Sequence, residues 1–287
     1  MPMPDFPIID THLHLWDPLR FRMPWLDGNT LLNKAYDLAA YDEHTSGLSI
    51  ASMVYLQVDV APPYALLEAA WVVDLAKKDQ RLQGIVPWAP LEYGEHVRAF
   101  LEALTALDPR IKGVRRIVQS EPELDFCLQP GFVRGTQILS EYGLSCDLGI
   151  HQGQLPATVE LVRRCPETSF VLDHLGKPNI KDRALDPWRQ GISELAALPN
   201  VCCKVSGIVT EADHQHWAAS DLQPFLDHAL AAFGEDRVLF GGDWPVALSA
   251  SPYSRWVEAL YSLTQHLTPQ AQRKLWYENG RRVYRLP

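Results

Sequence analysis

The sequence predicts an α/β protein built as a single (β/α)8 barrel of the TIM type over residues 1–287. Short β-branched runs alternate with segments of helical periodicity, which is the pattern of parallel strands joined by crossover helices. About eight such runs occur, the number that closes a parallel barrel. Barrels of this kind reach ~250 residues as one domain, and no linker, charge run or low-complexity segment divides the chain. We therefore predict one domain.

The predicted strands are short and mostly apolar on both faces, as expected where one face fills the barrel and the other meets helices. In chain order they are PIIDTHLH at 7–14, ASMVYLQV at 51–58, LQGIVPWA at 82–89, IKGVRR at 111–116, LSCDLGI at 144–150, SFVLDH at 169–174, VCCKVSG at 201–207 and RVLFGGD at 237–243. A long loop with little periodicity, residues 15–30, follows the first strand. Loops at this end of barrel strands are where substrate-facing groups normally lie.

Several predicted helices carry start or stop signals. Proline is favoured in the first helical turn, and glycine just after the last one. A helix is predicted over 64–79, directly after Pro62-Pro63. Two more are predicted over 131–142 and 221–233, and they end before Gly143 and Gly234. The last predicted helix begins after Thr268, at Pro269.

Composition excludes several classes of function. The net charge of −9 argues against nucleic acid or an anionic membrane as a partner, because either would need a basic face. No apolar run is long enough for a membrane helix, and the N-terminus lacks the apolar region of a signal peptide. The five cysteines form no C-x-x-C pair, so we expect reduced thiols in a cytoplasmic protein. A monomer and a homodimer are both compatible with the sequence.

Candidate catalytic groups stand at the ends of three predicted strands. His12 and His14 are two residues apart, so strand alternation places both imidazoles on one face, where they suit a divalent ion such as zinc. His174 ends the sixth strand, and Asp243 ends the eighth. Each signal is weak alone, since such residues are often only caps or hydrogen-bonding surface groups. Because the carboxyl ends of barrel strands converge on one mouth, the set together predicts an active site there.

Several motifs together resemble the amidohydrolase-related proteins, and more closely the sugar-acid lactonase branch with its L-fuconolactonases and L-rhamnono-lactonases. They are IIDTHLHLWDP, IKGVRR, DHLGKP, CKVSGI, FGGDWPV and YENGRRVY, which span the chain almost from end to end. The resemblance implies a distorted barrel that hydrolyses the ester bond of small cyclic sugar lactones. Two positions depart from the family pattern, which often has serine at Gly242 and alanine at Gly280.

The resemblance also implies roles for the strand-end residues. His12 and His14 match the histidine pair of strand one, His174 matches the strand-six histidine, and Asp243 matches the aspartate that acts on water as general base. These four residues form a plausible site for one zinc or manganese ion. Relatives in this branch include lactonases that need no metal, so whether catalysis requires the ion is left open.

Arg115 ends the fourth strand, where some amidohydrolases carry a bridging carboxylated lysine. Arginine cannot ligate a metal, so we expect one metal at most, with the guanidinium polarising the substrate carbonyl. The alternative for Arg115 is an ion pair with a barrel carboxylate. We predict further substrate contacts near the mouth: His151, Trp25, Gln57, Trp88 and Lys177. The alternatives are a solvent-facing loop histidine for His151, a turn cap for Lys177 and ordinary packing for the other three.

The predicted function is therefore a carboxylic-ester hydrolase for small sugar lactones. The alternatives are a lactonase of the 2-pyrone-4,6-dicarboxylate type, a metal-dependent decarboxylase on the same fold, and a barrel that only binds a sugar acid. The first two would need cationic groups in the mouth to hold substrate carboxylates. Only Arg115 and Lys177 are candidates for that task in the sequence.

Overall fold

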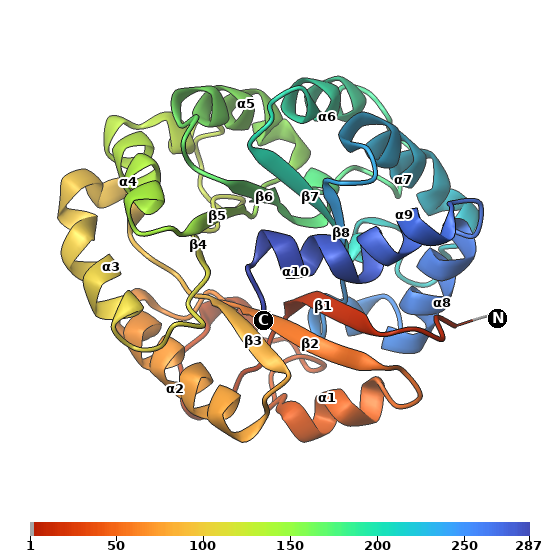
Figure 1. The fold of residues 1–287 in the computed structure, drawn as a ribbon, viewed down its shortest axis with the longest axis horizontal. Coiled ribbons are helices and arrows are strands. Elements are labelled where there is room, and N and C mark those ends of the chain that lie inside the picture. The colour runs from red at the N-terminus through yellow and green to blue at the C-terminus, as the bar shows by residue number, and fades with distance from the viewer. Residues whose placement is uncertain (1–2) are drawn as a thin grey trace.

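A computed structural model describes residues 3–287 and confirms the predicted barrel (Figure 1). Eight parallel strands follow one another around the ring in sequence order. They are β1 (Ile8–Leu13), β2 (Ile50–Leu56), β3 (Leu82–Val86), β4 (Gly113–Arg115), β5 (Ser145–Leu148), β6 (Phe170–Leu172), β7 (Val201–Ser206) and β8 (Val238–Gly241). All eight lie where the sequence predicts a strand.

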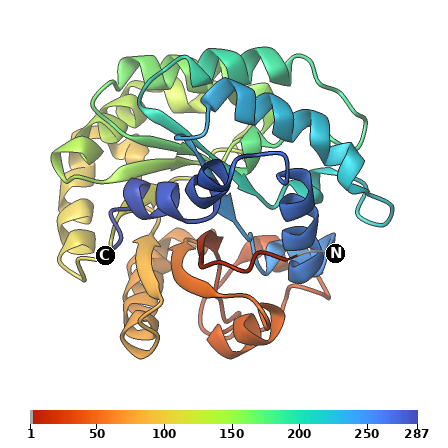
Figure 2. The same cartoon turned by 45° about the vertical axis from the view of Figure 1, so that its right-hand side comes forward.

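Most of the helices form an outer layer around the strands, and the last two cover one end of the barrel (Figures 1 and 2). The helices are α1 (Leu38–His44), α2 (Ala65–Lys78), α3 (Arg98–Thr105), α4 (Pro130–Glu141), α5 (Leu155–Arg164), α6 (Trp188–Ala196), α7 (Ala219–Phe233), α8 (Tyr253–Leu263), α9 (Pro269–Arg273) and α10 (Asn279–Val283). The predicted cap is present, since the Thr268 hydroxyl accepts a hydrogen bond from the Ala271 amide at 3.1 Å. None of the helices within residues 3–287 is long and apolar enough to cross a membrane. All five cysteines are free thiols.

The ring of strands has two weak junctions. Strands β1 to β3 form one sheet and β4 to β8 another. Single bridges connect the two sheets, between Ile85 and Ile111 on one side and between Leu13 and Trp244 on the other. The distortion that the family resemblance implies therefore lies at β3/β4 and β8/β1. The second junction joins the strands that carry His12, His14 and Asp243.

The C-terminal segment closes one end of the barrel. In Figure 1, α9 and α10 lie across the ring, and the C-terminus ends near its middle. Tyr284 and Leu286 join a buried cluster of strand residues such as Ile9, Val54 and Leu239. Gly280 allows the close approach, because a Cβ there would lie 2.7 Å from Thr11 Cγ2. An alanine here would therefore require Thr11 to shift.

Candidate active site

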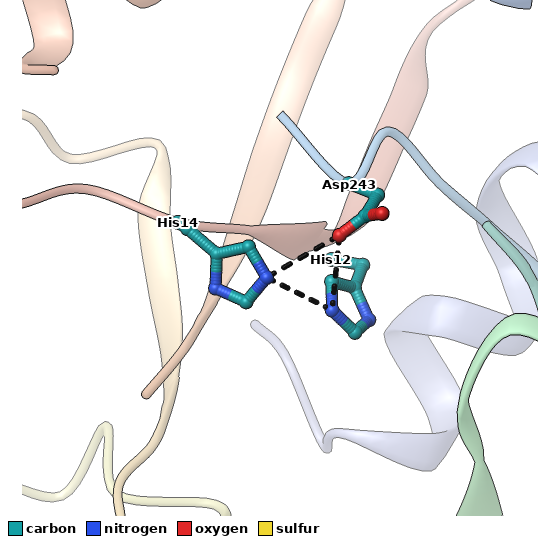
Figure 3. A group of neighbouring side chains, drawn as sticks. All are labelled: His12, His14 and Asp243. Atoms are coloured by element: carbon teal, nitrogen blue, oxygen red, sulfur yellow. Dashed lines mark hydrogen bonds and ion pairs between the residues drawn. The ribbon is translucent and has the colours of Figure 1, made fainter. Parts of the chain in front are cut away.

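The junction between β8 and β1 brings three predicted residues together (Figure 3). The Asp243 amide donates to the His12 carbonyl at 2.7 Å, and the His14 amide donates to the Trp244 carbonyl at 2.8 Å. Asp243 has a left-handed backbone, with φ 55°, two residues past the end of β8. All three side chains are buried and point toward one another.

The facing atoms of these side chains have the spacing of metal ligands. His12 Nε2 and His14 Nε2 are 3.2 Å apart, and Asp243 Oδ1 lies 3.6 Å from the first and 3.4 Å from the second. Tetrahedral zinc at about 2.0–2.1 Å from nitrogen and oxygen ligands keeps those atoms about 3.3–3.4 Å apart. The three residues could therefore hold one divalent ion.

The outer nitrogens of both imidazoles fix which nitrogen faces the centre. His14 Nδ1 lies 2.8 Å from the Leu56 carbonyl oxygen, which can only accept a hydrogen bond, so Nδ1 is the donor. His12 Nδ1 lies 3.3 Å from Asp173 Oδ1. Burial lowers the pKa of His12 well below its usual value, so its imidazole is neutral. Both Nε2 lone pairs then point at Asp243, an arrangement that favours a cation between them.

His174 lies beside this group on a left-handed turn after β6, with φ 52°. Its ring centroid is 4.4 Å from that of His12, and its Nδ1 is 3.9 Å from Asp243 Oδ2. The same nitrogen is 3.0 Å from the Ser206 carbonyl. The structure therefore brings all four predicted residues together, although His174 stands outside the triangle formed by the other three.

Electrostatics keep Asp243 ionised. Burial alone would raise its pKa, but the electrostatic interaction with His174, the largest opposing influence, holds the pKa below its ordinary value. Gly207 makes room for this carboxylate, since a Cβ there would lie 2.1 Å from Asp243 Oδ2.

Arg115 lies at the boundary between the pocket and the barrel interior. Its Nη1 is 3.1 Å from Asp173 Oδ2 and 3.2 Å from His12 Nε2, and its Nη2 donates to the Gln57 carbonyl. Arg115 therefore forms the ion pair with a barrel carboxylate that was its alternative role, here with Asp173. It also faces the pocket.

A cavity of about 200 Å³ opens above these groups. That is below the roughly 300–1,000 Å³ of pockets for drug-sized ligands, so it suits a small molecule. Its lining includes six of the predicted residues: His14, Trp25, Arg115, His174, Lys177 and Asp243. It also includes polar residues that the sequence analysis did not select, among them Asp59, Gln119, Ser120 and Thr210.

Three predicted substrate contacts are not among the residues that line this cavity. Gln57 is fully buried, and its side-chain oxygen accepts from the Asp59 amide. Trp88 packs edge-on against Phe100, with ring centroids 5.7 Å apart. His151 is exposed, and its amide donates to Gln154 Oε1 at 2.9 Å. Substrate binding by these three stays a prediction.

Sequence reasoning missed Asp10, which fastens the β8/β1 junction. Its Oδ1 accepts from the amides of His12 at 3.0 Å and Gly242 at 2.7 Å. Its Oδ2 accepts from the hydroxyls of Tyr41 at 2.9 Å and Tyr253 at 2.8 Å. A Cβ on Gly242 would lie 2.5 Å from Asp10 Oδ2, so a side chain here would displace Asp10. Its spacing of two from His12 was a signal that could have found Asp10.

The barrel therefore gathers imidazoles, a carboxylate and a guanidinium at the carboxyl ends of its strands, as barrel enzymes do. A model of the amidohydrolase family matches residues 9–286, and the chain belongs to that family.

Two similar proteins are L-fucono-1,5-lactonases. The one from Burkholderia multivorans is 32% identical, with 97% of this chain and 96% of that protein covered. The one from Burkholderia ambifaria is 28% identical, covering 97% and 95%. A crystal structure of a Burkholderia multivorans amidohydrolase with bound zinc is also similar, with a TM-score of 0.88 at 32% identity over 98% of this chain and 100% of that one.

Proposed function

We propose that this protein opens small neutral sugar lactones, such as L-fuconolactone, by hydrolysis of the ring ester. The observation that carries the proposal is the ionised Asp243 beside the imidazoles of His14 and His174 and the Arg115 guanidinium on the floor of a small pocket. The similarity to two L-fucono-1,5-lactonases supports it.

Asp243 is the general base of the proposed reaction. Its carboxylate takes a proton from water, and the water oxygen forms a bond to the lactone carbonyl carbon. Negative charge then develops on the carbonyl oxygen, where Arg115 and His174 stabilise it. When the tetrahedral intermediate collapses, the bond to the ring oxygen breaks and the departing alkoxide takes the proton back from Asp243. The product is the open hydroxy acid.

His12, His14 and Asp243 are the proposed ligands of one divalent ion, with His174 beside them. The fit rests on the separations of 3.2, 3.4 and 3.6 Å and on the two converging lone pairs. Such an ion, zinc or manganese, would polarise a carbonyl or lower the pKa of a bound water. Asp243 Oδ1 faces the two histidines, so Oδ2 stays available to accept the proton.

The charges around the pocket favour a neutral substrate over a dicarboxylated one. Arg115 is paired with Asp173, and Lys177 Nζ lies 3.7 Å from Glu211 Oε1. Both cations that line the cavity are thus already neutralised by a carboxylate, and Asp59 and Asp243 add negative charge. A pyrone dicarboxylate or the acid substrate of a decarboxylase would need free cations there.

Hydrolysis of a panel of aldonolactones, followed with a pH indicator, tests the proposal. We expect rapid acid release by the wild type and a loss of about 10²–10⁴-fold in kcat for Asp243→Asn, because the general base is removed. Asp74→Asn, on the exposed face of α2, is the matched control and should keep full activity. No hydrolysis across the panel, or an Asp243→Asn variant as active as the control, would refute the proposal. Activity that survives chelation in protein free of metal by elemental analysis would remove the ion from the mechanism.

A further inference from the structure

One wall of the pocket is the segment of residues 57–60 that follows β2. Val58 and Asp59 of this segment line the cavity. Asp59 has a left-handed backbone, with φ 55°, a conformation that is unfavourable for residues other than glycine and is tolerated best by asparagine and aspartate. Such a conformation persists only where the surroundings hold it, and it is often associated with function.

Four side chains hold this segment in place. Arg115 donates to the Gln57 carbonyl, and the Gln57 side chain accepts from the Asp59 amide. Glu68 Oε1 accepts from the Val58 amide at 2.9 Å, and Trp25 Nε1 donates to the Val58 carbonyl at 2.7 Å. Every hydrogen bond in this set goes to the backbone. Their combined effect is to fix where Asp59 lies in the pocket wall.

The Asp59 carboxylate itself is unengaged. Asp59 is exposed, and among residues 3–287 its carboxylate has no hydrogen-bond or ion-pair partner, whereas the buried carboxylates Asp10, Asp147 and Asp173 are each paired. A carboxylate can only accept hydrogen bonds, and its two oxygens suit a pair of donors on the ligand. The rigid backbone therefore presents two free acceptors to whatever occupies the cavity.

We propose that Asp59 determines substrate specificity: its carboxylate accepts hydrogen bonds from ring hydroxyls of a neutral polyhydroxy lactone and repels lactones that carry an anionic substituent. This inference rests on the lactonase function proposed above and adds the residue that recognises the sugar. It also gives Gln57 a role different from the predicted one, since Gln57 supports Asp59 from behind.

The test compares Asp59→Asn with Asp74→Asn, which removes the same charge from an exposed site on α2. Asparagine tolerates the left-handed backbone, so folding is preserved. Three probes are used: L-fucono-1,5-lactone, δ-valerolactone, which has no hydroxyl, and a γ-lactone with a carboxylate substituent. For Asp59→Asn we expect KM for the polyhydroxy lactone to rise about 10- to 100-fold, as for loss of hydrogen bonds to a charged group. KM for δ-valerolactone should stay unchanged.

The carboxylated lactone should bind the variant more tightly, as substrate or competitive inhibitor, by several-fold because the repulsion is removed. Asp59→Gly, which removes the side chain and suits the left-handed backbone, should reproduce the loss on the polyhydroxy lactone. Unchanged KM values in both variants would overturn the inference, as would an equal rise for all three probes. If the wild type hydrolyses no polyhydroxy lactone, the proposed function itself fails; if it does and the variants behave as wild type, only the role of Asp59 fails.

Discussion

Glu68 of α2 is a buried carboxyl with one oxygen in use. Its Oε1 accepts from the Tyr55 hydroxyl at 2.7 Å and the Val58 amide at 2.9 Å, whereas Oε2 has no partner among the described residues. Burial raises its pKa from 4.5 to about 7, although both hydrogen bonds and Arg115 act in the opposite direction. Glu68 therefore supports the pocket wall at the expense of stability at high pH.

Glu68→Gln should remove this pH dependence. A carboxyl whose pKa is raised on folding contributes stability below its unfolded pKa and loses it as the pH rises through the folded value. A shift from 4.5 to about 7 corresponds to about 3 kcal/mol. The glutamine keeps the accepting oxygen, so we expect equal stability near pH 4 and a gain approaching about 3 kcal/mol at pH 8. Urea unfolding at both pH values measures this, and a gain that is the same at both would contradict the assigned cause.

The sequence could predict residues whose position follows from strand alternation. His12 and His14 share a face because they are two apart on a strand, and the structure brings both to Asp243. The sequence could not predict the positions of side chains that depend on the backbone conformation beyond the end of a strand. Gln57 lies behind the pocket wall and Asp59 lines it, because Asp59 has a left-handed conformation that alternation does not describe. Asp173 was visible beside His174, but its contact with His12 depends on the packing of two distant strands.

At the scale of elements, the strand order was predictable and the strand ends were not. The predicted run 82–89 contains β3, which ends at Val86, and the run 144–150 contains β5, which ends at Leu148. The chain leaves the ladder at Pro87, which has no amide proton to donate. Past β5, Gly149 lines the pocket, whereas past β3 Trp88 packs against Phe100. Site residues are therefore found where the regular pattern stops.

The β8/β1 junction depends on Asp10 more than on strand pairing. Within residues 3–287 two backbone hydrogen bonds and the bridge from Leu13 to Trp244 connect these segments, whereas Asp10 joins four donors from β1, the turn after β8 and two helices. Asp10→Ala would leave these donors buried without an acceptor, at about 1–3 kcal/mol for each unsatisfied group. We expect a loss of at least about 3 kcal/mol in the free energy of unfolding, together with reduced binding of zinc, since His12 and Asp243 lose their common support.

Asp10→Asn is the control for this prediction. It keeps Oδ1 for the two amides, and the two tyrosine hydroxyls can rotate to accept from its amide group. Its loss of stability should be clearly smaller, and isothermal titration with zinc should give an affinity near that of the wild type. If Asp10→Ala and Asp10→Asn lower the free energy of unfolding and the zinc affinity equally, the negative charge of Asp10 is the important property, and its hydrogen bonds are not.

At the scale of the whole molecule, the barrel interior is unusually polar below the active site. Barrel interiors are commonly filled by branched aliphatic side chains. Here Lys204 of β7 is fully buried, with Nζ 2.7 Å from Asp147 Oδ2 and 3.1 Å from Asp173 Oδ1. Tyr284 from the C-terminal segment donates to Asp147, and its ring lies 5.1 Å from Lys204 Nζ. A continuous set of charges thus links the closed end of the barrel, through Asp173, to His12.

Lys204→Met should show how these charges depend on one another. Removing one partner of a buried ion pair costs about 3–5 kcal/mol, because it leaves an uncompensated charge, whereas replacing both partners by apolar residues is often close to neutral. We therefore expect Lys204→Met to lose about that much stability, and Lys204→Met with Asp147→Leu to recover part of it, since Asp173 keeps Arg115 as its partner. Denaturant unfolding of the two single variants and the double variant gives the coupling energy. If the losses of stability of the two single variants add up to the loss of the double variant, Lys204 and Asp147 are not coupled. The set of charges from Tyr284 to His12 would then not act as one unit.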